Sequence, residues 1–292
     1  MTVVTERARA KINLTLSILG RRPDGYHALL SLVAFAGAAD DVTLNAAAPT
    51  GVTVTGPFAA AISGVNLIDM ALTLVADAVP DLTIGHVTLD KNLPVASGVG
   101  GGSSDAAAVL RAIRKAHPAA TADIDWSGIA QRLGADVPVC FNDRAAWMSG
   151  AGETLHTLDT PLPRLDAVLV NPQAPVPANK TARVFRALGA PPLAANEASV
   201  PSAIPAIPDR AELLALMARI GNDLEAPATA VVPEIEDVIT ALEACPGLRI
   251  ARLSGAGPTC FAIFDDAPSA ETAAAALATD HPGWWIAPVV IG

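Results

Sequence analysis

A glycine-rich segment is the part of this sequence best suited to binding phosphate. It runs from Leu93 to Asp105, between an expected strand at 86–90 and an expected helix at 104–116. Four of the five residues from Gly98 to Gly102 are glycine, and glycine lets a backbone approach a ligand closely. The free N–H groups at the start of the following helix would attract phosphate oxygens. The segment is therefore a candidate anion-binding loop.

We compared this segment with two known phosphate-binding loops and with a purely structural connector. No lysine follows the glycines, so it is not a Walker A loop, and Ser103 stands where a dinucleotide loop has its third glycine. A flexible connector, with Ser103 or Asp105 capping the helix, is the simpler reading. A cap needs fewer glycines than this segment has, which favours anion binding.

Three polar side chains become candidates for catalysis only in combination. Residues 10–19 alternate between apolar and polar types, which predicts a strand with one buried and one polar face. Lys11 and Asn13 would share the polar face, although a solvated outer face would have the same pattern. Asp136 follows an expected helix at 125–133 that Gly134 ends, where a turn or capping role is equally plausible.

An aromatic pair follows a Pro-Asp-Gly turn. Tyr26 is the only tyrosine of the chain, and His27 is next to it. Such a pair could stack on a flat ring and bond its edge, or it could simply anchor the turn. The other histidines have neither metal-ligand spacing nor a Ser-His-Asp order, and no Gly-x-Ser-x-Gly elbow occurs. Hydrolase chemistry therefore has little support.

Composition restricts the class of protein. The 292 residues include 19 Lys+Arg against 29 Asp+Glu, a net charge of −10, which argues against nucleic-acid and anionic-membrane partners. The N-terminus lacks an apolar signal core, and the longest apolar stretch, 28–39, is too short to cross a bilayer. Three widely spaced cysteines fit a reducing compartment. We expect a soluble, cytoplasmic globular protein.

The order of elements predicts the fold class and a domain boundary. Strands and helices mix without a strict β-α-β rhythm, which favours α+β over a doubly wound parallel sheet. The proline-rich stretch at 161–177 is the best candidate for a boundary. We therefore expect two domains, at 1–160 and 161–292.

Five motifs, taken together and in order, resemble the GHMP small-molecule kinases. They are Lys11-Ile-Asn13, Gly25-Tyr26-His27, the loop from Pro94 to Ser104, Gly134-Ala-Asp-Val-Pro138 and Leu253-Ser-Gly-Ala-Gly257. The similarity covers essentially the whole chain. Arg9 stands where the family often has proline, and Ala96-Ser97 stands where it usually has two glycines.

The resemblance implies a two-domain fold with its active site in the interdomain cleft. The N-terminal domain would bind ATP and the C-terminal domain would be ferredoxin-like. Mg²⁺ would accompany ATP, because it bridges phosphate oxygens and needs few protein ligands; which residues touch it, and the oligomeric state, stay open. The residues that this resemblance assigns to ATP are Pro94, Val95, Ala96, Ser97, Gly98, Val99, Gly100, Gly101, Gly102, Ser103 and Ser104.

The resemblance also assigns catalytic and substrate-binding roles. Asp136 would accept the proton of the acceptor hydroxyl, and Lys11 would keep that carboxylate ionised and oriented. Within the family, the motifs are most similar to those of members that phosphorylate the C2 hydroxyl of a cytidine-diphosphate-linked methylerythritol. The substrate-binding residues would be Asn13, Tyr26, His27, Thr181 and Phe185. The alternatives are another GHMP kinase and a non-catalytic ligand sensor with the same fold.

Overall fold

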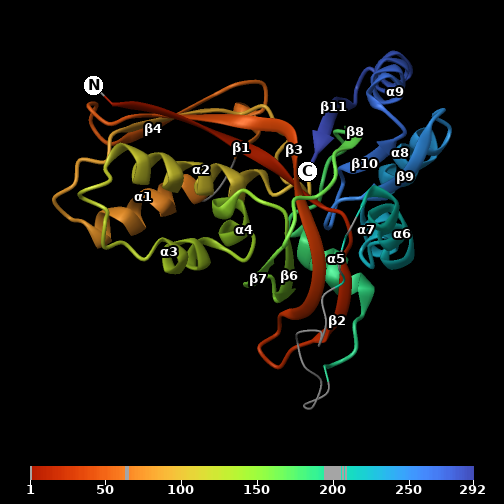
Figure 1. The fold of residues 1–292 in the computed structure, drawn as a ribbon, viewed down its shortest axis with the longest axis horizontal. Coiled ribbons are helices and arrows are strands. Elements are labelled where there is room, and N and C mark those ends of the chain that lie inside the picture. Colours follow the sequence, from red (N-terminus) through yellow and green to blue (C-terminus); the bar gives the residue numbers. More distant parts are fainter. Residues whose placement is uncertain (1, 63–65, 194–204, 206, 208) are drawn as a thin grey trace. The chain divides into compact units, whose positions relative to one another are not determined.

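The residues pack as two compact units, each built from several stretches of the chain. The computed structural model describes residues 2–62, 66–193, 205, 207 and 209–292 (Figure 1). The first unit consists of Met1–Lys11, Ala38–Val95 and Gly100–Arg144. The second consists of Ile12–Gly37, Ala96–Val99 and Ala145–Gly292. Two long strands, β1 (Val3–Asn13) and β3 (His27–Asn45), have residues in both units.

The strands of the first unit form a mixed sheet. β1 pairs with β3. β3 runs antiparallel to β5 (His86–Asp90), and β4 (Gly51–Thr55) runs parallel to β5. The prediction of a strand at 86–90 is confirmed.

Helix α2 (Gly101–Ala116) contacts the three other α-helices of the first unit. These are α1 (Leu67–Ala78), α3 (Trp126–Leu133) and α4 (Val137–Asn142), and a short 3₁₀ turn lies at Ala59–Ala61. All α2 residues from Ser104 to Ile113 are buried, four of them alanine. Small side chains let neighbouring helices approach α2 closely, so this helix forms the core of the unit.

The second unit contains an antiparallel sheet with the strand order β11–β8–β10–β9. Its strands are β8 (Leu165–Asn171), β9 (Leu248–Leu253), β10 (Cys260–Phe264) and β11 (Trp285–Ile291). The first part of β3 pairs with β2 (Ser17–Arg21) and β6 (Ala146–Gly150), and β6 pairs with β7 (Thr154–Thr157).

Helices of the second unit share one apolar core with this sheet. Side chains such as Val170 and Phe264 from the sheet pack with Val184, Ile235 and Leu277 from the helices. The helices that contribute to this core are α5 (Lys180–Leu188), α7 (Glu225–Val231), α8 (Glu234–Glu243) and α9 (Ala267–Asp280), and α6 (Arg210–Ile220) is a further helix of the unit. The mixture of helix and strand confirms the predicted α+β class. Within the described ranges, none of the helices combines the length and apolar character needed to cross a bilayer.

Two predictions about local structure need correction. The expected strand at 10–19 is broken, because Leu14 and Leu16 donate backbone hydrogen bonds to Leu32 and Gly221 instead of continuing one ladder. The alternative of a solvated outer face is also wrong, because Lys11 and Asn13 are only 4% and 6% exposed. The helix expected from residue 104 begins at Gly101, directly after a left-handed Gly100.

Candidate functional site

The glycine loop leads directly into helix α2. Gly100 has φ 66° and occupies the N-cap position without a capping side chain. A Cβ on Gly100 would lie 3.2 Å from Lys11 Cβ, so this part of the loop packs closely on β1. The first-turn N–H groups of a sixteen-residue helix follow at once, and these groups have no partner within the helix. They suit the phosphate oxygens predicted at Gly100 to Ser103, whereas Ser104 N already donates to Gly100 O at 2.8 Å.

The earlier part of the loop, 96–99, belongs to the second unit and is held there by backbone contacts. Thr259 N donates to Ser97 O at 2.9 Å, and Ser254 Oγ donates to Gly98 O at 3.1 Å. Gly98 has φ 84°, and a Cβ there would lie 2.7 Å from the carbonyl oxygens of Ser254 and Gly257. Only glycine fits at this position.

Lys180 is a buried cation that sequence reasoning missed. Its Nζ donates to Ala96 O at 3.0 Å and also to Gly257 O. Burial lowers the pKa of Lys180 to about 8, because desolvation disfavours the charged form. Two features of the sequence could have drawn attention to Lys180: the chain has only four lysines, and this one directly precedes the candidate substrate-binding residue Thr181. Lys180 links the loop to the Ser254–Gly257 turn.

A second buried lysine lies beneath the start of α2. Lys91 Nζ donates to Asp40 Oδ2 at 2.5 Å and to Asp105 Oδ2 at 2.7 Å. Burial raises the pKa of Asp105 to about 8, against the opposing effect of the Lys91 ammonium. A Cβ on Gly101 would lie 3.2 Å from Lys91 Nζ. No local sequence pattern indicates this cluster, because its members lie on β3, directly after β5 and on α2.

The structure brings the predicted catalytic pair together in the first unit. Lys11 Nζ donates to Asp136 Oδ1 at 2.8 Å. The Lys11 side chain is 5% exposed, whereas that of Asp136 is 38% exposed. Asp136 is the N-cap of α4, yet its side chain accepts no capping hydrogen bond. The carboxylate is therefore fixed by a buried ammonium and still reaches the surface.

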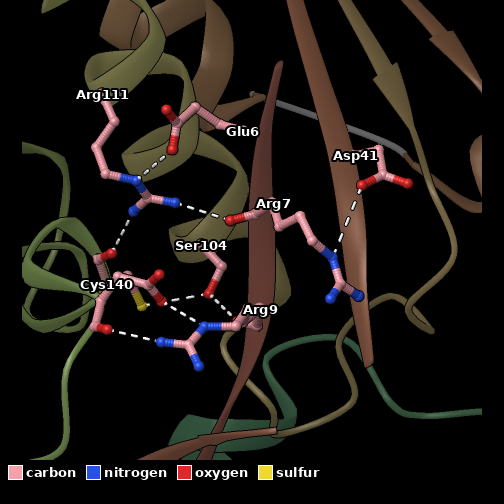
Figure 2. Close-up of polar contacts among 8 residues, drawn as sticks. Glu6, Arg7, Arg9, Asp41, Ser104, Arg111 and Cys140 are labelled. Atoms are coloured by element: carbon pink, nitrogen blue, oxygen red, sulfur yellow. Dashed lines mark hydrogen bonds and ion pairs between the residues drawn. The ribbon is translucent and has the colours of Figure 1, made fainter. Parts of the chain in front are cut away.

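Ser104 joins three elements of the first unit. Its Oγ donates to the carbonyl of Arg9 in β1 at 2.8 Å and lies 3.3 Å from Cys140 Sγ in α4 (Figure 2). Burial raises the pKa of Cys140 to about 12, so this thiol is not a nucleophile near neutral pH. The predicted ATP-binding serine thus has a hydroxyl that positions the start of α2 against β1 and α4.

Arg111 of α2 also connects α4 to β1. Its Nη1 donates to Cys140 O at 2.6 Å, its Nη2 to Arg7 O at 2.8 Å, and its Nε to Glu6 Oε2 at 3.0 Å (Figure 2). The guanidinium is buried, and each of its three nitrogens donates to one of these partners. Arginine suits this position because its planar group can bind several acceptors at once.

Asn13 presents a buried acceptor without a partner. Ser31 Oγ donates to Thr15 O at 2.6 Å, so Ser31 has to accept from Asn13, and the Asn13 atom facing it at 2.7 Å is therefore Nδ2. Asn13 Oδ1 then points away and has no hydrogen-bond partner among the described residues. A buried, unpaired carbonyl oxygen could accept a hydrogen bond from a hydroxyl, an amine or a water at this place.

The predicted substrate-binding aromatics are partly brought together. His27 and Phe185 stack with ring centroids 4.6 Å apart at 26°, in the second unit. Burial, together with the charge of Arg21, lowers the pKa of His27. Tyr26 does not join this stack: its side chain is 66% exposed, and its backbone N donates to Asp24 Oδ1. Thr181 lies exposed in the first turn of α5.

Comparison with known families supports the motifs. Residues 66–144 match the GHMP kinases N terminal domain, and residues 203–282 match GHMP kinases C terminal. A 4-diphosphocytidyl-2-C-methyl-D-erythritol kinase of Rhodopseudomonas palustris is 48% identical over 289 residues, covering 96% of this chain and 95% of the relative. One of Methylobacterium radiotolerans is also 48% identical and covers both chains completely.

Solved structures agree with the family match. A crystal structure of 4-(cytidine 5'-diphospho)-2C-methyl-D-erythritol kinase is similar with a TM-score of 0.76, 34% identity and 99% coverage of both chains. A homoserine kinase from Cytophaga hutchinsonii has a TM-score of 0.69 at 16% identity, which shows the shared fold alone. Because the relatives match over almost the whole length, and both family segments occur in order, this chain belongs to the GHMP kinases.

Proposed function

We propose that this chain is an ATP-dependent kinase that phosphorylates the C2 hydroxyl of 4-diphosphocytidyl-2-C-methyl-D-erythritol. The observation that carries the reaction class is the ion pair between Lys11 and Asp136, 2.8 Å apart, with the carboxylate partly exposed. Relatives that are 44–48% identical over their full length and are named for this substrate support the choice of acceptor.

The proposed reaction transfers one phosphoryl group. The C2 oxygen attacks the γ-phosphorus of ATP, the bond from that phosphorus to the β–γ bridging oxygen breaks, and ADP leaves. The hydroxyl proton passes to the Asp136 carboxylate. Lys11 holds Asp136 Oδ1, which leaves the other carboxylate oxygen for the acceptor. Phosphoryl transfer needs little more than such positioning and stabilisation of charge.

ATP is the phosphate donor in this family, and we propose that its phosphates lie at the glycine loop. The left-handed Gly100 followed by the free N–H groups of α2 supports this placement. The earlier residues, Pro94 to Val99, would complete the binding segment. Ser103 is the residue of the first turn whose side chain is available, since Ser104 Oγ already donates to Arg9 O.

Mg²⁺ fits this chain as an ion carried by ATP. The described residues contain no group of three His, Cys, Asp or Glu side chains that could hold a metal. Mg²⁺ commonly keeps several waters and binds through substrate phosphates with one or two carboxylates. When bound, the ion would neutralise charge on the phosphate oxygens.

The methylerythritol and cytidine parts of the substrate need different contacts. We propose that Asn13 Oδ1, buried and unpartnered, accepts a hydrogen bond from an acceptor hydroxyl. The cytosine ring needs an aromatic face and polar groups at its edge, which Tyr26, His27 and Phe185 would supply, with Thr181 nearby in sequence. The stack of His27 on Phe185 supports the grouping of these two rings.

Two broader predictions stand as proposals. The division at residue 160 is supported by the family segments, which lie on either side of it at 66–144 and 203–282. A reducing, cytoplasmic location is supported by three free cysteines at 140, 245 and 260.

The test is a phosphoryl-transfer assay with the purified chain, ATP and Mg²⁺. We expect turnover with the cytidine-diphosphate substrate, and a product whose ³¹P NMR spectrum places the new phosphate on C2. Mevalonate, homoserine and galactose serve as comparison acceptors. Turnover of one of these alone would overturn the substrate and leave the kinase class intact. Binding of both ligands without transfer would instead support a ligand sensor.

A further inference from the structure

Strand β1 contacts helix α4 at both ends of the helix. At the N-terminal end, Lys11 binds the N-cap residue Asp136. At the C-terminal end, Arg9 Nε donates to Asp143 Oδ1 at 2.9 Å, and Arg9 Nη2 donates to Asp143 O at 2.7 Å. Arg9 and Lys11 are two positions apart in β1, so their side chains leave the same face of the strand.

Helix α4 depends on outside contacts for its position. It has six residues, and a helix of this length is not stable by itself in water. Apolar residues of α4, such as Val137 and Val139, are buried, but apolar packing is not directional. Hydrogen bonds from guanidinium groups to a carboxylate and to carbonyl oxygens are directional. Arg9, with Arg111 at Cys140 O, supplies these at the C-terminal half of α4.

The charge of Arg9 also suits this end of the helix. The last carbonyl groups of a helix have no partner within it and carry partial negative charge. Asp143 follows the helix in a left-handed conformation with φ 51°, and its side chain and backbone oxygen both accept from one guanidinium. The bidentate contact therefore fixes both the direction and the end of α4.

We propose that Arg9 is a positioning residue for the reaction, which holds α4 so that Asp136 keeps its place beside Lys11. This rests on the proposed role of Asp136 as proton acceptor. The guanidinium contacts of Arg9 to Asp143 let it act on Asp136 through helix α4. A shift of about 1 Å in a catalytic group can cost on the order of 100-fold in rate, so a loosened α4 is expected to lower kcat.

The first test compares Arg9→Met, Arg9→Lys and the control Arg7→Met. Arg9→Met is expected to lower kcat by about five- to fifty-fold, with KM for both substrates within about twofold of the wild type. Arg9→Lys should fall between, because an ammonium cannot bind both Asp143 oxygens in the same planar way. Arg7, whose side chain pairs with Asp41 at 4.0 Å between half-exposed groups, should leave kcat unchanged. Unchanged kcat in Arg9→Met would overturn the proposal.

The second test separates positioning from a general loss of structure. In an Asp136→Asn background, Arg9→Met should cause no further loss of kcat, because residues that act through one group are not multiplicative. A full second loss would show that Arg9 acts elsewhere and would overturn the proposal. If Arg9→Met does not fold, Asp143→Gly gives the comparison, since it removes the side-chain acceptor of Arg9 Nε and glycine adopts the left-handed conformation without strain. If Asp136→Asn alone keeps full kcat, the proposed role of Asp136 fails first.

Discussion

The carboxylate of Asp136 is available for chemistry because its own helix does not use it. Aspartate is a favoured N-cap residue, and its side chain normally accepts a hydrogen bond from the first turn. Here the side chain makes no such bond, and Lys11, 125 positions earlier, holds Oδ1 instead. Local sequence predicts a cap or turn at Asp136. The pairing was expected only from the order of motifs along the chain, and the structure confirms the proximity.

Substitution of Asp136 tests its proposed role. Asp136→Asn keeps the shape of the side chain but removes the proton acceptor, so kcat should fall by roughly 10²- to 10⁴-fold. Lys11→Ala should act on the same step, and the double variant should be far less impaired than the product of the two single effects. Steady-state kinetics measures both. Nucleotide affinity, measured by calorimetry, should stay nearly constant, and strictly multiplicative losses would show two independent roles.

Tyr26 is the exposed member of the aromatic pair. Its side chain is 66% exposed, so the ring is free to stack on a base, an interaction worth roughly 1–3 kcal/mol. Tyr26→Ala should therefore raise KM for the cytidine substrate by about 5- to 150-fold and leave KM for ATP unchanged. Val3→Ala, at another exposed apolar position, is the control. An effect on ATP alone would assign Tyr26 to the turn.

The alternation of residue types predicted which side chains share a face and left the burial of that face open. A solvated outer face was one interpretation of the polar residues at 10–19, yet Lys11, Asn13 and Thr15 are all buried. A period of two identifies which residues share a face, but it does not say whether a second layer covers that face. In the structure Lys11 is covered by Asp136, and Asn13 by Ser31. Both partners come from other elements, so no local pattern could predict the burial.

At the scale of elements, the position of the glycine loop between a strand and a helix was predicted correctly, but the first residue of that helix, α2, was not. The expected helix began at residue 104, because glycine disfavours helix interiors. In the structure the left-handed Gly100 ends the loop, and Gly101 and Gly102 form the first turn. A buried ion cluster lies next to this turn, formed by Lys91 with Asp40 and Asp105. Such a cluster depends on residues far apart in sequence, which propensity does not report.

A side chain at Gly101 should disturb this turn. A Cβ there would lie 3.2 Å from Lys91 Nζ, and the larger valine would press on the buried ion cluster and shift the first-turn N–H groups. Gly101→Val should therefore weaken ATP binding at least about tenfold, roughly 1.4 kcal/mol. Calorimetric titration with ATP measures it. Gly283→Ala, where a Cβ meets nothing within 4 Å, should bind like the wild type, and unchanged affinity in both would make the loop purely structural.

At the scale of the whole molecule, the compact units are not continuous in sequence. β1 and β3 have residues in both units, and 96–99 belongs to the second unit although the residues on both sides belong to the first. Sequence reasoning expects a boundary where composition changes, as at 161–177, because linkers are rich in proline. It has no signal for a strand shared by two units. The α+β class was predictable because it depends only on the order of helices and strands.

Lys180 gives the unfolding free energy of the chain a characteristic pH dependence. Burial lowers its pKa to about 8 from the ordinary 10.5, so between these values the unfolded chain binds more protons than the native one. The unfolding free energy of the wild type, relative to Lys180→Met, should therefore rise with pH, by about 1–2 kcal/mol between pH 7 and pH 9. Below pH 7 both states are protonated, and the difference should be flat. Denaturant titration followed by tryptophan fluorescence measures it, since Trp147, Trp284 and Trp285 lie in the second unit with Lys180. A difference that stays constant from pH 7 to pH 9, or falls, would show that Lys180 keeps its proton in the native state and does not carry the desolvation penalty of a buried ammonium.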